Sequence, residues 1–208
     1  NLALSTRGIE ALNKVGLAEK VLSDAIPMNG RLMHDKKGEL KYQPYGKNGQ
    51  YINSVSRSGL NIKLLELADE YENVKLFFNY RCIEADLNNN QCVLLNEMGE
   101  KVTVKADIMF GSDGAFSAIR SEMQKLNRFT YSQTYENYGY KELEIVPGDK
   151  ELFQIEKNAL HIWPRGEFMM IALPNPNGSF TCTLFLPFEG ELAFDDLTNE
   201  DKVRSYFE

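Results

Sequence analysis

A short apolar segment, residues 106–110, runs directly into Gly111-Ser112-Asp113-Gly114 and then into a helical pattern. This order of strand, glycine-rich turn and helix narrows the choice of fold more than any other stretch, because it is typical of α/β domains. Such a turn presents backbone N–H groups at a helix N-terminus, where anionic ligands bind. Asp113 can accept hydrogen bonds from ribose hydroxyls or from water near a pyrophosphate. The alternative is a plain connector in which Asp113 caps the helix.

The pattern of the chain changes near residue 128. Before residue 128, helical and strand patterns alternate. The helical patterns cover 2–25 (broken at Gly16), 55–71 (with Ser58 as N-cap) and 116–126. The strand patterns cover 31–34, 39–43, 74–79, 81–87, 92–95, 102–104 and 106–110. After residue 128, β patterns over 129–146, 160–163, 168–173 and 180–188 precede a helix over 195–208. We expect an α/β protein with α+β elements: one part of an α/β domain with a small β-hairpin insert over 1–127, and a mostly antiparallel sheet over 128–208.

Composition excludes several classes of function. The net charge of −7 argues against nucleic acid or anionic lipid as a broad partner. Three cysteines without a CxxC pair and only two histidines indicate no metal site. No apolar run reaches the roughly 20 residues of a membrane span. Because the chain starts at Asn1 without Met and its last helical pattern is unfinished, we expect it to be a piece of a longer protein.

Alternation along the C-terminal strands predicts one apolar face. Its members point to one side of the sheet, and they are Leu160, Ile162, Met169, Ile171, Leu173, Thr183 and Phe185. This face is either a ligand pocket or an ordinary sheet core. His161 is out of phase with its neighbours and is interpreted as structural, and His34 has no assigned role. No general base is evident among these residues.

The turn belongs to a longer motif, Gly111-Ser112-Asp113-Gly114-Ala115-Phe116-Ser117-Ala118-Ile119-Arg120. This motif resembles the shared FAD/NAD(P)H motif of flavin-dependent aromatic hydroxylases. Further segments resemble the kynurenine 3-monooxygenase family within that class, from end to end of the chain. They are 26–28, 44–46, 50–52, 54–57, 60–61, 73–75, 131–133, 160–165, 168–174 and 179–185, with Arg31 and His34 as single positions.

The resemblance implies a partial FAD-binding domain over 1–127 and a substrate-binding sheet domain over 128–208. By this resemblance the cofactor-binding residues are Ala3, Arg57, Cys82, Asp113 and Gly114, with Ala3 and Cys82 contributing backbone. Arg57 is otherwise a surface arginine at a helix start. The substrate-binding residues implied are Arg31 and Tyr45, which would hold a carboxylate, and an apolar wall of Leu160, Ile162, Met169, Ile171, Leu173 and Phe185. A guanidinium and a phenol are both good donors to a carboxylate.

The activity implied is hydroxylation of L-kynurenine to 3-hydroxykynurenine with FAD, NADPH and O2, through a flavin C4a-hydroperoxide, in tryptophan catabolism and NAD biosynthesis. The substrate's own amino group activates the ring, so no catalytic side chain and no metal is expected. The protein has to position the ring, exclude water and bind FAD.

The family's N-terminal Gly-x-Gly-x-x-Gly unit and its downstream flavin motif do not occur in these residues, nor do its downstream substrate residues. We therefore expect the chain by itself to be inactive and to bind FAD weakly. The alternatives are another FAD-dependent aromatic hydroxylase, or a binding module without flavin. A bacterial cytoplasmic location is expected, while the oligomeric state and any anchor outside these residues stay open.

Overall fold

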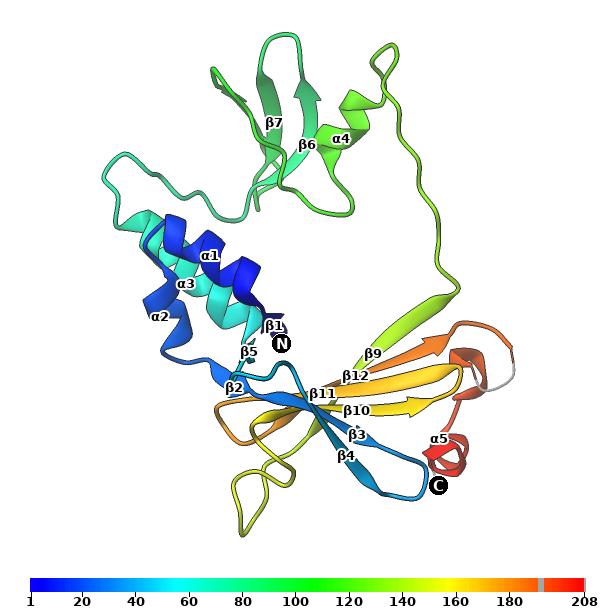
Figure 1. Ribbon diagram of the computed structural model, residues 1–208. Coiled ribbons are helices and arrows are strands. Elements are labelled where there is room, and N and C mark those ends of the chain that lie inside the picture. The colour runs from blue at the N-terminus through cyan, green and yellow to red at the C-terminus, as the bar shows by residue number, and fades with distance from the viewer. Residues whose placement is uncertain (191–192, 208) are drawn as a thin grey trace. The chain divides into compact units, whose positions relative to one another are not determined.

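The computed structural model describes residues 1–190 and 193–207, and its contacts divide the chain into two compact units. Unit 1 comprises Asn1–Glu70 and Glu136–Glu208, and unit 2 comprises Tyr71–Tyr135 (Figure 1). Helices combined with mostly antiparallel sheets confirm the predicted α/β class with α+β elements. The predicted boundary at residue 127 separates a cofactor-binding part from a substrate-binding part, and this boundary stays a prediction.

Unit 1 is built on a six-stranded sheet in the order β4-β3-β10-β11-β12-β9 (Figure 1). Its strands are β3 (Gly30–His34), β4 (Leu40–Pro44), β9 (Tyr138–Ile145), β10 (Ala159–Arg165), β11 (Phe168–Pro174) and β12 (Phe180–Pro187). β3 and β10 run parallel, and the other neighbouring strands run antiparallel. The predicted β3–β4 hairpin is confirmed, and it extends the sheet made by the later strands.

The two faces of this sheet differ in burial. Face A, as we call it, carries Ile162, Ile171 and Thr183, which lie opposite one another on β10, β11 and β12. Face B carries the alternate positions, including Ala172 and Cys182, which belong to the buried core. Along β12 every second residue is buried and the residues between are only partly buried. Face B is therefore the covered side of the sheet, and face A is the more open side.

A second, three-stranded sheet of unit 1 has the order β1-β5-β2, with β1 (Leu2–Leu4), β2 (Ile26–Met28) and β5 (Ile52–Val55) all antiparallel. The helices α1 (Thr6–Lys14), α2 (Ala18–Leu22) and α3 (Arg57–Asp69) belong to the same part of the chain (Figure 1). The prediction of a helix from residue 2 is wrong at its start, because residues 2–4 pair with β5. The N-cap of α3 is Ser56 and not Ser58, since the Ser56 hydroxyl accepts from the Gly59 N–H at 3.1 Å.

Unit 2 contains the predicted meander, β6 (Arg81–Asp86), β7 (Gln91–Leu95) and β8 (Lys101–Lys105), followed by α4 (Ala118–Met123). The strands predicted over 74–79 and 106–110 are wrong. Asn79 has a φ of 63°, which interrupts an extended run, and Phe110 is 86% exposed without a pairing strand among the described residues. These apolar stretches satisfied the pattern of a strand but have no neighbour to complete a ladder.

The strand predicted over 129–146 begins only at Tyr138, where pairing with β12 starts. The helix predicted over 195–208 consists of a short 3₁₀ turn, η1 (Phe194–Asp196), and α5 (Glu200–Phe207), and its last residue lies outside the described part. Within the described residues, no helix combines the length and apolar character needed to cross a membrane.

Candidate functional site

The apolar residues predicted to form a pocket wall share face A. Ile162 pairs with Ile171, and Met169 pairs with Phe185 on the next strand. Because side chains two apart on a strand point the same way, the remaining wall residues, Leu160 and Leu173, also belong to face A. Most of this wall is only partly buried. The fold therefore brings together six residues from three strands, as the alternation predicted, on the more open side of the sheet.

Arg31 and Tyr45 lie together at the edge of this face. Arg31 is level with Leu160 in the parallel β3–β10 pair, and its guanidinium lies 5.4 Å from the centroid of the Tyr45 ring. The Tyr45 hydroxyl is buried and has no hydrogen-bond acceptor among the described residues; burial raises the pKa of this phenol, and the neighbouring Arg31 partly offsets the rise. A buried donor without a partner is costly unless a ligand supplies the acceptor. The pair thus offers two donors to a carboxylate beside an apolar wall.

Ala3 and Arg57 lie at one end of the three-stranded sheet. Ala3 pairs with Ser54, and α3 begins at Arg57, two residues after β5 ends. The Arg57 side chain is exposed, and no hydrogen bond or ion pair of it is found among the described residues. An exposed arginine in the first turn of a 13-residue helix is well placed for an anionic group. Both predicted cofactor residues of unit 1 are thus connected to β5, Ala3 by pairing and Arg57 by sequence.

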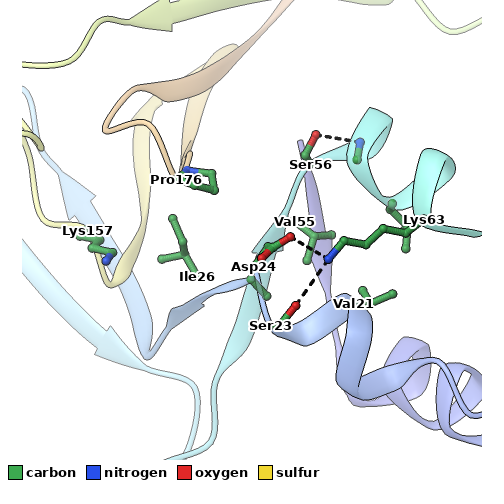
Figure 2. A pocket seen from close by; sticks show the side chains of 12 residues that line it. Val21, Ser23, Asp24, Ile26, Val55, Ser56, Lys63, Lys157 and Pro176 are labelled. Carbon is green, nitrogen blue, oxygen red and sulfur yellow. Dashed lines mark hydrogen bonds and ion pairs between the residues drawn. The ribbon is translucent and has the colours of Figure 1, made fainter.

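A cavity of about 500 Å³ lies next to the same helix start, lined by residues of α2, β2, β5 and α3 (Figure 2). Figure 2 shows Lys63 reaching into it, with its ammonium 2.7 Å from the carboxylate of Asp24. The lysine also donates to the Lys20 carbonyl at 2.6 Å. Lys63 therefore already has a carboxylate partner, whereas the other lining cation, Lys157, lies with its ammonium 5.1 Å from the centroid of the Phe153 ring. Arg57 is not among its lining residues.

In unit 2, the Asp113 carboxylate accepts hydrogen bonds from the start of α4, whose N-cap is Ser117. One carboxylate oxygen accepts from the Ser117 hydroxyl at 2.5 Å, and the other accepts from the Ala118 and Ile119 N–H groups at 2.8 and 3.3 Å. The hydrogen bond from Ser117 is the main cause that lowers the pKa of this carboxyl. The N-cap predicted at Asp113 is Ser117 instead, and Asp113 supports the first turn through the Ala118 and Ile119 N–H groups; its role toward a cofactor stays a prediction.

Arg120 closes the other side of this turn, because its guanidinium donates to the carbonyls of Gly114 and Ala115. Gly114 has a φ of 79°, which favours glycine, and the turn borders a cavity of about 480 Å³. The side chains of Asp113, Ser117 and Arg120 thus all bond to groups within the motif itself. Its exposed backbone is what remains for a ligand.

Cys82 lies at an irregularity of the meander. The register between β6 and β7 shifts between Cys82 and Glu84, so one residue of β6 has no opposite residue in the ladder. Burial raises the pKa of the Cys82 thiol, which keeps it protonated. Both features fit a backbone contact better than thiol chemistry. Ala3 and Arg57 belong to unit 1, whereas Cys82, Asp113 and Gly114 belong to unit 2.

Two polar clusters were not evident from the sequence. The buried Ser54 hydroxyl donates to the Pro174 carbonyl at 2.8 Å, and the Asn1 amide donates to the same carbonyl at 3.1 Å. On face B, His161 is fully buried and its Nδ1 lies 2.8 Å from Nε2 of His34. The residues involved are far apart in the sequence, and no local pattern joins them.

Known proteins are similar in sequence to the whole of this chain. A family described as FAD binding domain matches residues 2–174. A kynurenine 3-monooxygenase of Dictyostelium discoideum is 48% identical over 100% of the chain and 45% of its own length. Those of Myxococcus xanthus and Sus scrofa are 46% and 43% identical, again over 100% of the chain, which covers 45% and 43% of their lengths. The chain thus spans less than half the length of these curated relatives.

Among solved structures, p-nitrophenol 4-monooxygenase PnpA of Pseudomonas putida is similar with a TM-score of 0.74 and 14% identity, over 99% of the chain and 50% of that protein. Klebsiella pneumoniae HpxO complexed with FAD and uric acid is similar with a TM-score of 0.71 and 17% identity, over 99% and 52%. At these identities the likeness shows the fold alone. It confirms the hydroxylase-like fold expected from the motif.

Proposed function

The chain belongs to the FAD binding domain family, and from this premise we propose that the whole protein is an FAD- and NADPH-dependent kynurenine 3-monooxygenase. It would hydroxylate L-kynurenine to 3-hydroxykynurenine with O2, in tryptophan catabolism. Relatives of that name match every part of the chain at 40–48% identity, which supports this substrate over other aromatic acids. The observation that carries the proposal is the Arg31–Tyr45 pair at the edge of an apolar face.

The chemistry of the substrate fits this arrangement. L-Kynurenine combines an aromatic amine with an amino-acid carboxylate. Arg31 and Tyr45 would hold the carboxylate by charge-assisted hydrogen bonds, and the buried Tyr45 hydroxyl would gain the acceptor that it lacks. The face A wall would then fix the ring by apolar contact and keep water away from it. In this scheme the side chains position the substrate, and none of them acts as acid or base.

FAD, reduced by NADPH, would supply the activated oxygen when bound. Taken within each unit separately, the predicted cofactor residues suit contacts with such a group. Arg57 is an exposed cation at a helix start, and residues 111–114 of the glycine-rich turn are exposed. The irregular backbone at Cys82 offers a further contact. Ala3 would contribute its backbone beside β5.

The test is steady-state kinetics of the full-length protein with kynurenine, followed by NADPH oxidation. Replacing Arg31 by Ala or Tyr45 by Phe should raise the KM for kynurenine, about 10- to 100-fold for the arginine, because a hydrogen bond to a charged group contributes about 1.5–3 kcal/mol. An Arg7→Ala variant on the exposed side of α1 is the matched control and should leave KM unchanged. Equal KM values in Arg31→Ala and in the control would refute the carboxylate role.

A second arm compares substrates. Kynurenine should stimulate NADPH oxidation and yield a hydroxylated product, whereas p-nitrophenol, which lacks a carboxylate, should not. If another aromatic acid is hydroxylated faster than kynurenine, the oxygenase class stands and the substrate is wrong. A cytoplasmic location is proposed on the acidic net charge of −7, and cell fractionation would check it.

A further inference from the structure

On face B, opposite the predicted substrate wall, a separate cavity of about 660 Å³ lies between the strands and α5. Its apolar lining comes from Trp163, Phe168, Met170 and Phe207. We propose that this cavity is a second ligand site, specific for a small aromatic carboxylate, and independent of the kynurenine site.

The walls of the cavity are suited to an aromatic ring. Phe168 and Phe207 lie with ring centroids 6.4 Å apart in an edge-to-face arrangement. Trp163 is stacked on His34 at 4.1 Å, so one side of the indole is covered and its orientation is fixed. Rigid aromatic walls of this kind bind flat apolar rings, and the volume lies within the usual range for small-molecule sites.

The polar lining of the cavity favours a negative charge. It contains Lys36 and Arg165, and no Asp or Glu is among its described lining residues. Arg165 donates to the carbonyls of His34, Pro164 and Asp35 at 2.8, 2.9 and 3.2 Å. These acceptors are neutral, so they fix the guanidinium in place without cancelling its charge. Two of its five N–H groups remain for a ligand.

A further donor in the cavity has no partner. The Tyr206 hydroxyl is buried and finds no hydrogen-bond acceptor among the described residues. Burial raises the pKa of this phenol to about 12, so the group is a donor at neutral pH. Its ring packs on Phe168 with centroids 4.8 Å apart, which holds it in the wall. A carboxylate can accept from this hydroxyl and from Lys36 and Arg165, which line the same cavity, and this favours a carboxylate over a neutral aromatic ligand.

The site differs from the predicted kynurenine site by its position in the sheet. Trp163 and Met170 are cross-strand partners on face B, whereas Arg31 is level with Leu160 on face A. Neighbouring residues on β10 point in opposite directions, so no side chain of the strands serves both sites. The proposal therefore stands or fails separately from the oxygenase function.

The test uses the full-length protein, and the fluorescence of Trp163, which lines the cavity, is isolated as the difference from a Trp163→Phe variant. The probes are phenylacetate, its neutral isostere phenylacetamide, and inorganic phosphate. Saturation-transfer NMR of each probe gives a second readout. Phenylacetate should change the fluorescence in a saturable way. Both the amide and phosphate should bind at least about tenfold more weakly, because one lacks the charge and the other the ring.

Two variants locate the site. Tyr206→Phe removes only the hydroxyl and keeps the ring packing, and Lys36→Gln removes only an exposed charge; each should weaken phenylacetate binding about five- to tenfold. Arg31→Gln, on face A, is the control and should leave the phenylacetate titration of Trp163 fluorescence unchanged, because Trp163 lies on face B. The proposal is overturned if phenylacetate shows no saturable binding by either readout, if the amide or phosphate binds equally well, or if Arg31→Gln alone weakens binding.

Discussion

Unit 1 should lose stability as the pH falls below about 6.5, because of the histidine pair on face B. The ring of His161 is fully buried, and its Nε2 lies 2.7 Å from the Glu156 carbonyl. A carbonyl can only accept, so Nε2 carries the proton and Nδ1 is left as an acceptor for the Nε2–H of His34. Protonating Nδ1 of His161 would set two N–H groups against each other at 2.8 Å.

The direction follows from the pKa of each ring. Burial is the largest cause that lowers the pKa of both His161 and His34 below the usual 6.5, and in His34 the charges of His161 and Arg165 lower it further. Below pH 6.5 the unfolded chain takes up protons that the folded chain excludes. The stabilisation is therefore complete above this pH and is lost as the pH falls toward the folded-state pKa. The limiting slope is about 1.4 kcal/mol per pH unit for His161, and His34 adds less because it is partly exposed.

The assay is urea unfolding between pH 8 and pH 5, followed by the fluorescence of Trp163, which is stacked on His34. The free energy of unfolding should be constant above pH 7 and should fall below pH 6.5. The chain has only two histidines, and its perturbed aspartates have a lowered pKa and so titrate at lower pH. A His34→Gln/His161→Gln variant should be less stable but should lose the slope. An unchanged slope in this variant, or none in the wild type, would refute the reasoning.

Three further substitutions test separate parts of the fold. Ser117→Ala removes the N-cap of α4 and should cost about 1 kcal/mol, seen as faster hydrogen exchange of the Arg120 amide. Ser54→Ala removes the buried donor to Pro174 and should lower the free energy of unfolding by about 1–2 kcal/mol in urea titrations. Gly30→Ala places a Cβ 2.6 Å from a backbone oxygen of the neighbouring strand. It should lower the free energy of unfolding by about 1–3 kcal/mol and so lower the urea midpoint, and an unchanged midpoint would contradict the close packing of β3 on β4.

The sequence predicted those elements that complete themselves locally. The β3–β4 hairpin, the meander of unit 2 and the alternation of β10 to β12 were all evident, because turn residues and a period of two are local signals. The wrong predictions concern segments whose secondary structure depends on pairing with a strand that is distant in the sequence. Residues 2–4 became a strand because β5 lies beside them, and residues 106–110 did not because no described strand pairs with them.

The candidate site shows the same division. Alternation predicted which side chains share face A, but only the β3–β10 register brings Arg31 level with Leu160. That pairing joins residues about 130 positions apart, so no pattern in the chain could specify it. The resemblance to hydroxylases supplied Arg31 and Tyr45 as a pair. The structure adds the physical reason, a buried phenol without an acceptor beside a guanidinium.

The small sheet also links the two kinds of site within unit 1. β5 leads directly into Arg57, and its Ser54 hydroxyl bonds to the carbonyl of Pro174, the residue after Leu173 of the face A wall. Arg57, a proposed cofactor contact, and Leu173, a residue of the proposed substrate wall, thus each lie within a few residues of the buried Ser54–Pro174 hydrogen bond. Removing that bond should disturb both, so Ser54→Ala in the full-length protein should weaken binding of FAD and of kynurenine together. Loss of one affinity alone would show that the two sites are held independently.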